Sequence, residues 1–108
     1  MPKYLYHASY TAEGLQGLRK DSAAGRKAAV QAAIKGLGGK LESMYYALGA
    51  DDVVLIADLP DNSAAAAVAV LTGSTGLVRV RTTALLTIEE ADKALAMEGK
   101  YRAPGGGK

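Results

Sequence analysis

His7 is the only histidine in this chain of 108 residues, and histidine is the side chain that ordinarily titrates near neutral pH. Acid–base catalysis and metal ligation are the chemistries that it would support. The chain has no cysteine, and no cluster of carboxylates lies near His7 in the sequence, so we expect no metal site and no cofactor. His7 lies in a stretch in which tyrosines alternate with other residues. This pattern favours a packed, hydrogen-bonded histidine over a catalytic one.

Tyrosine is the only aromatic residue type, with six copies. Tyr45 and Tyr46 are adjacent in an expected strand, so one must face the helices and the other the opposite side of the sheet. Packing in the core explains both residues and is the favoured role. Orientation or protonation of a substrate oxygen is the alternative for Tyr45, Tyr46 and Tyr6.

Three charged residues complete the set of candidate ligand-binding residues. Asp52 follows the expected turn Gly49-Ala50-Asp51, and we favour a carboxylate that accepts turn amides over a ligand contact. Arg79 and Arg81 share one face of the last expected strand. Paired arginines suit a carboxylate or phosphate ligand. An ion pair between subunits, or a charged edge that deters strand addition, explains them equally well.

Apolar spacing and turn residues predict the elements that must position these side chains. The expected strands cover residues 3–10, 40–48, 52–57 and 77–86, and the expected helices cover 23–37, 62–71 and 87–98, with a weaker helical turn at 11–18. Thr87 and Glu90 have the spacing of a capping box. The strand at 40–48 is expected to alternate regularly, with Leu41, Ser43, Tyr45 and Ala47 on one side.

The order strand, helix, strand, strand, helix, strand is that of a ferredoxin-like α+β domain with an added C-terminal helix. In this fold both crossover helices cover one face of an antiparallel sheet, and the other face stays bare. The run Val53-Val54-Leu55-Ile56-Ala57 is typical of a strand that is buried on both faces. A soluble monomer rarely exposes so large an apolar surface, so we expect a homodimer that packs sheet to sheet.

Length and composition indicate one domain, residues 1–98, followed by a flexible glycine-rich tail at 99–108. The formal net charge is only +2. No aromatic residues interleave with the basic residues at 19–40, so a solvated helix face is favoured over nucleic-acid binding. No apolar run is long enough to span a membrane, and Met1–Tyr4 lacks the apolar core of a signal peptide. We therefore expect a cytoplasmic protein with neither a nucleic acid nor a membrane as partner.

The ordered set of features resembles the GYD-domain family over about residues 3–98. The match rests on the helix that ends at Gly38-Gly39, the hairpin Gly49-x-x-Asp52 before Val53-Val54, Pro60-Asp61 before an alanine-rich helix, and Thr87-x-Glu89-Glu90. The resemblance implies a dimeric α+β barrel and no established common activity. The tyrosine of the family's Gly, Tyr, Asp signature is replaced by Asp51. The hairpin is also similar to that of the ligand-binding domains of feather/famine-type transcription regulators.

Two functions fit these observations. The first is a dimeric module without catalysis that binds a small molecule or forms an oligomer. The alternative is an enzyme with little need of cofactors, similar to a monooxygenase or isomerase and acting on a small apolar or aromatic substrate. In that case His7 and a tyrosine would line a cavity between sheet and helices, with Asp52 or Arg79 orienting the substrate. The catalytic residues, and whether the chain is an enzyme at all, stay open.

Overall fold

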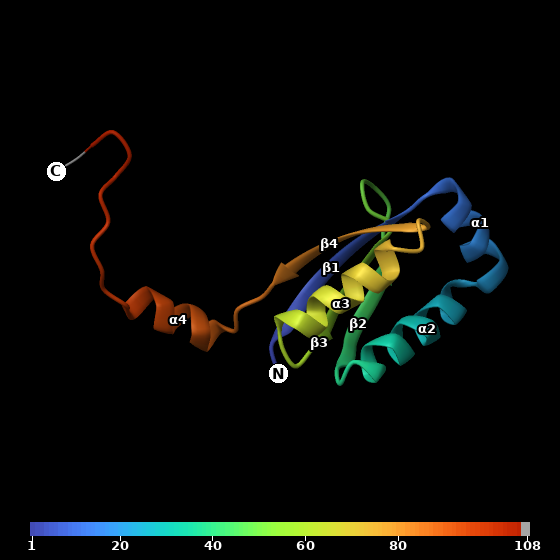
Figure 1. The fold of residues 1–108 in the computed structure, drawn as a ribbon, viewed down its shortest axis with the longest axis horizontal. Coiled ribbons are helices and arrows are strands. Elements are labelled where there is room, and N and C mark those ends of the chain that lie inside the picture. Colours follow the sequence, from blue (N-terminus) through green and yellow to red (C-terminus); the bar gives the residue numbers. More distant parts are fainter. Residues whose placement is uncertain (107–108) are drawn as a thin grey trace.

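A four-stranded antiparallel sheet with helices against one face forms the body of the protein, as a computed structural model that describes residues 1–106 shows (Figure 1). The strand order is β2-β3-β1-β4. The elements are β1 Lys3–Tyr10, α1 Ala12–Asp21, α2 Ala23–Gly36, β2 Lys40–Tyr46, β3 Val53–Asp58, α3 Asn62–Gly73, β4 Val78–Ala84 and α4 Ile88–Ala96. The expected ferredoxin-like α+β fold with a C-terminal helix is confirmed.

The hydrophobic core lies between the sheet and helices α2 and α3. Tyr4 and Tyr6 of β1 are buried there beside Leu55 of β3, and Ile34 of α2 and Val68 of α3 pack from the helix side. The buried tyrosine hydroxyls need hydrogen-bond partners, and α3 provides them. Tyr4 Oη donates to Asn62 Oδ1 at 2.6 Å, and Tyr6 Oη donates to the Ala65 carbonyl at 2.7 Å.

The other face of the sheet, here called the open face, has no helix over it among residues 1–106. Strand alternation places Leu5 of β1 and Val54 and Ile56 of β3 on this face, where all three are half-buried. Arg79 and Arg81 of β4 lie on the same face, because they are paired with Ser9 and His7 of β1. The bare apolar face that the fold implies is therefore present.

Strand β2 differs from the expected regular alternation. A β-bulge between Leu41 and Ser43 pairs Leu41 with Ala57 and Ser43 with the next residue, Ile56. The extra residue, Glu42, moves every later side chain to the opposite face from the one that simple alternation predicts. Leu41, Met44 and Tyr46 thus share the helix side. The grouping of Leu41 with Ser43 and Tyr45 was wrong.

Helix α1 is longer than the helical turn expected at residues 11–18. The Thr11 hydroxyl caps it by accepting from the Gly14 amide at 3.1 Å. Gly14 lowers helix propensity but is required by packing, because a Cβ there would lie 2.1 Å from the Leu77 carbonyl oxygen. Ser22, at φ 78°, turns the chain sharply from α1 into α2.

Helix α4 leaves the body beyond β4 and stands apart from it (Figure 1). The expected capping box is confirmed, since the Glu90 amide donates to Thr87 Oγ1 at 3.0 Å and the Thr87 amide donates to Glu90 Oε1 at 2.8 Å. No side chain of α4 is buried. Of the helices in the described part of the chain, none has the length and apolar character needed to cross a membrane. The tail expected to be flexible includes residues 107 and 108, which lie outside the described range.

Candidate ligand-binding cleft

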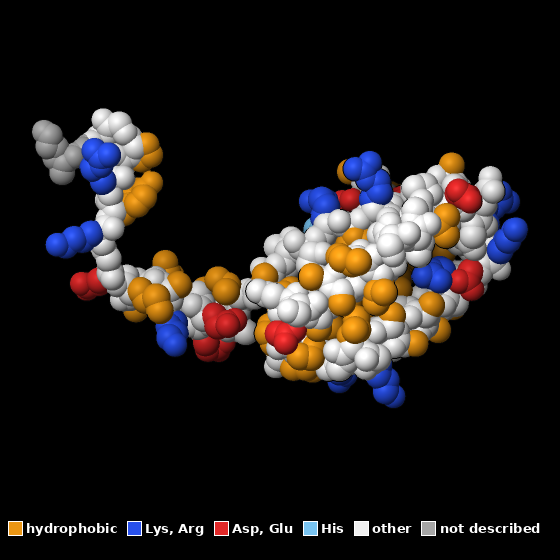
Figure 2. All heavy atoms as spheres, viewed as in Figure 1, with side chains coloured by type: hydrophobic (Ala, Val, Ile, Leu, Met, Phe, Trp, Pro, Cys, Tyr) orange, Lys and Arg blue, Asp and Glu red, His pale blue; other side chains and the backbone are white. Residues whose placement is uncertain are grey.

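A cleft bordered by α1 opens between α2 and α3 and leads down to the sheet. Its outer part has a volume of about 350 Å³ and is lined by small or apolar residues that include Gly17, Ala33 and Leu71. Its inner part, about 60 Å³, reaches Tyr6, Val68 and side chains of the sheet. Figure 2 shows hydrophobic side chains gathered between these two helices. The cleft exists because glycine and alanine on the helices leave space that larger side chains would fill.

A polar cluster stands where the two parts of the cleft meet, with Asp21 at its outer side and Tyr46 behind Tyr10. Tyr10 and Arg26 line both parts. Arg26 Nη1 lies 3.3 Å from Asp21 Oδ2, across the corner between α1 and α2. The hydroxyls of Tyr10 and Tyr46 are 3.5 Å apart, which is a long contact that leaves both oxygens able to bond to a ligand. The cleft thus combines an apolar interior with hydroxyl, guanidinium and carboxylate groups at one point.

Burial changes the pKa of two tyrosine hydroxyls on the helix side of the sheet, those of Tyr6 and Tyr46. It raises the pKa of Tyr6 to about 12. Burial and the hydrogen bond with Tyr10 also raise the pKa of Tyr46. Both hydroxyls are therefore neutral at physiological pH and serve as hydrogen-bond donors rather than as bases. The arrangement is suited to orienting a polar atom of a bound molecule.

His7 lies on the opposite side of the sheet from this cleft. It is on the open face, paired with Val54 on one side and Arg81 on the other. Tyr45 faces the same way, because its partner in β3 is also Val54. Tyr6 and Tyr46 face the helices, so the cavity that would hold His7 together with either of them is not formed within residues 1–106. The Nδ1 atom of His7 is buried and has no hydrogen-bond partner among those residues.

An ion pair covers part of the open face near His7. Arg81 Nη2 donates to Asp51 Oδ2 at 2.7 Å, and Ser9 Oγ donates to Asp51 Oδ1 at 3.1 Å. The Arg81 guanidinium lowers the pKa of the Asp51 carboxyl below its usual range. Arg79 is exposed on the same edge strand. Arg81 therefore has an ion-pair partner in its own chain.

Asp52 fixes the hairpin to β1. Its Oδ2 atom accepts from the Tyr10 amide at 2.8 Å, and its own amide donates to the Ala8 carbonyl at 2.9 Å. The carboxylate does accept a backbone amide, although the donor belongs to β1 rather than to the turn. This contact also holds Tyr10 in position beside the cleft.

Sequence reasoning missed Arg26, Asp21 and Tyr10 as members of this cluster. Arg26 was grouped with the solvated basic residues, and Asp21 was not among the candidate ligand-binding residues. A signal was present, because Arg26, Val30 and Ala33 recur at the spacing of one helix face. The contact of Tyr10 with Tyr46 depends on the bulge in β2 and carries no local signal.

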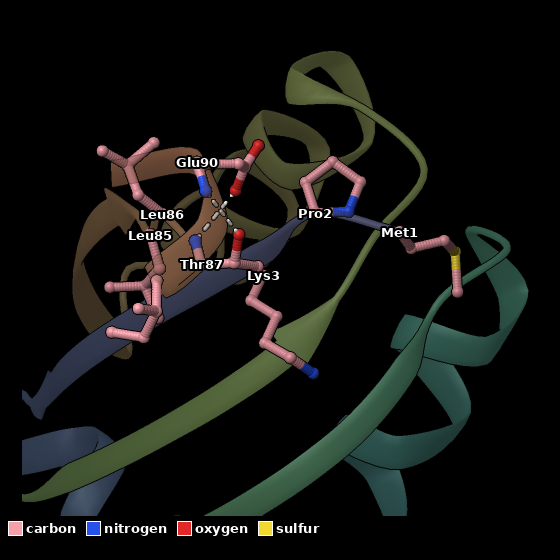
Figure 3. Close-up of a pocket in the computed structure, with 8 residues that line it drawn as sticks. Met1, Pro2, Lys3, Leu85, Leu86, Thr87 and Glu90 are labelled. Carbon is pink, nitrogen blue, oxygen red and sulfur yellow. Dashed lines mark hydrogen bonds between the residues drawn. The ribbon is translucent and has the colours of Figure 1, made fainter. Parts of the chain in front are cut away.

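A second hollow, of about 540 Å³, lies where α4 joins the body (Figure 3). Met1 and Pro2 form one side, and Leu85, Leu86 and the first turn of α4 form the other. Both sides are chain segments at the margin of the sheet, so this hollow is a space beside a joint rather than a preformed site. In the described part of the chain, no three His, Asp or Glu side chains gather as a metal site would require.

The fold and the cleft define a small ferredoxin-like α+β domain with an apolar cavity between its helices and sheet. The family model of the GYD domain matches residues 4–95. The chain therefore belongs to the GYD domain family, as its resemblance to that family predicted. Comparisons with curated proteins and with solved structures give no significant match.

Proposed function

We propose that the protein is a homodimeric module that binds a small, mainly apolar molecule in the cleft between α2 and α3, without catalysis. The observation that carries the proposal is the cleft itself. Its outer volume of about 350 Å³ falls in the range of about 300–1,000 Å³ that is usual for ligand sites. An apolar lining with a few polar groups at one point is the usual composition of such sites.

The polar cluster indicates the class of molecule. Arg26 offers a positive charge, and the Tyr10 hydroxyl, which contacts that of Tyr46, offers a hydrogen-bond donor, so an oxygen atom or an anionic group on an apolar body is the best match. Asp21 holds the guanidinium in place. No histidine lines the cleft within residues 1–106, which favours binding over acid–base catalysis.

Fluorescence of anilinonaphthalene sulfonate, an aromatic anion, tests this site. We expect saturable enhancement with the wild-type protein and loss of it in Ala33→Phe, which fills the outer cleft. Ala28→Phe is the matched control on an exposed position of the same helix that does not line the cleft. Arg26→Gln should weaken binding about tenfold, while Lys27→Gln should not. Equal binding by Ala33→Phe and wild type would contradict the proposal.

The open face supports the homodimer. Leu5, Val54 and Ile56 form its apolar centre, and Tyr45, at 71% exposure, extends it. A second copy is the simplest cover for such a surface, because a two-fold contact joins identical patches. We infer that the two open faces meet, so that each copy keeps its own cleft on the outer side.

A further inference from the structure

We propose that α4 is an exchanged arm that docks on a second copy of this chain, in the hollow between α2 and β2 of that copy. The docking goes beyond the contact between open faces, because it would join two copies through different residues. The proposal rests on the exposed stripe of α4, its short length and the charges of the two surfaces.

The first step is the amphipathic pattern of α4. Ile88, Ala91 and Leu95 recur at helical spacing and form one apolar stripe. Ile88 is 76% exposed and Leu95 is 83% exposed, and Figure 2 shows hydrophobic side chains along this arm. Such a stripe on a helix is normally buried against another element. Its own body buries no residue of this helix.

The second step is the length of the helix. α4 has nine residues, and isolated helices shorter than about 12–15 residues are only marginally stable in water. The capping box of Thr87 and Glu90 stabilises the first turn but adds only about 1 kcal/mol. A nine-residue helix with a complete apolar stripe therefore requires packing, and the missing surface must come from elsewhere.

The third step is charge. Residues 88–98 contain four carboxylates and one lysine. A hollow of about 550 Å³ between the end of α2 and the start of β2 is lined by Lys35 and Lys40 together with the apolar Ala32 and Leu41. This surface combines two lysines with apolar side chains, which complements an acidic amphipathic helix.

The fourth step is the position of the arm. It leaves the body at β4, an edge strand, and runs away from the other elements (Figure 1). An arm that extends past the edge of its own sheet is placed to reach a neighbouring molecule, as in domain swapping between identical chains.

Cysteine crosslinking tests the docking directly, because the chain has no cysteine of its own. Leu95→Cys and Ala32→Cys, both at exposed positions, are purified separately, mixed and treated with a short bismaleimide. We expect a crosslinked heterodimer on a denaturing gel. A mixture of Leu95→Cys with Ala12→Cys, an exposed site on α1, is the matched control and should give at least fivefold less product.

The charges and the route of the arm have their own controls. Lys35→Glu with Lys40→Glu should lower the crosslinking yield several-fold, whereas Arg19→Glu with Lys20→Glu on α1 should not. A double variant with both cysteines in one chain distinguishes the route, since a product at monomer mass would mean that the arm folds back on its own body and would overturn the proposal.

The outcomes also separate this proposal from the contact between open faces. Absence of the heterodimer in a sample that light scattering shows to be dimeric would overturn the arm and leave the homodimer standing. In a Val54→Lys background the open faces should not pack against each other. Crosslinking that persists in this background would support the docking of α4 independently of the contact between open faces.

Discussion

At the scale of single residues, Tyr6 connects the sheet to α3 through one buried hydrogen bond. Tyr6→Phe removes the donor to the Ala65 carbonyl and should lower the free energy of unfolding by about 1 kcal/mol. Urea unfolding at pH 7 measures the loss. Tyr101→Phe, at an exposed position in the C-terminal segment, is the control and should change nothing.

The same residue predicts how stability depends on alkaline pH. Burial raises the pKa of Tyr6 from 10.0 to about 12, so the unfolded chain loses this proton before the folded protein does. The free energy of unfolding should therefore fall as pH rises from 10 to about 12. Tyr6→Phe should reduce this slope. A slope that is the same in both proteins would contradict the role of Tyr6, although Tyr46 contributes to the wild-type slope as well.

Asp52 is the residue that joins the hairpin to β1. Asp52→Ala leaves the Tyr10 amide without its acceptor and should cost about 1–2 kcal/mol. Asp52→Asn keeps an acceptor oxygen at that place and should recover most of the loss. Thermal unfolding compares the two variants, and equal melting temperatures would show that the carboxylate hydrogen bond does not stabilise the hairpin.

At the scale of elements, two glycines of α1 should respond in opposite ways to alanine. Gly17 has open space around its Cβ position, so Gly17→Ala should stabilise the helix by about 1 kcal/mol. Gly14→Ala would place a Cβ against the Leu77 carbonyl and should destabilise the protein by about 1–3 kcal/mol. Thermal unfolding measures both. Stabilisation by Gly14→Ala would show that α1 is not packed against Leu77 as described.

The sequence predicts most elements, and it fails where tertiary contacts override local signals. Alternation in β1 correctly separates Tyr4 and Tyr6 from Leu5 and His7, because one face of the strand is buried and the other is not. The length of α1 was underestimated, since the packing of Gly14 is invisible in helix propensity. The polar cluster of the cleft depends on the corner at Ser22, which brings Arg26 of α2 close to Asp21 of α1.

The bulge in β2 could not be predicted, for a clear reason. No glycine or proline marks residues 41–43, and neither face of this strand is strongly polar, so hydrophobic pattern does not fix its register. Tyr45 and Tyr46 were expected on opposite faces, which is confirmed. Which of them faces the helices depends on the bulge alone.

At the scale of the whole molecule, the proposed homodimer predicts the mass in solution. Light scattering should give twice the chain mass of 11.1 kDa for the wild-type protein at micromolar concentration. Val54→Lys, at the centre of the open face, should shift the protein toward the monomer because it buries an unpaired charge. Val70→Lys, on the exposed side of α3, is the matched control. A monomeric wild type would contradict the homodimer.

The bulge at Glu42 has a consequence for solubility. β2 is an edge strand rich in residues that favour sheets, and such a strand can recruit other strands and aggregate. The irregular backbone between Leu41 and Ser43 interrupts the regular ladder that an incoming strand would need, with the charge of Glu42 inside the interruption and that of Lys40 just before it. We therefore expect the residue that places Tyr46 beside the cleft also to disfavour strand addition at the free edge of the sheet.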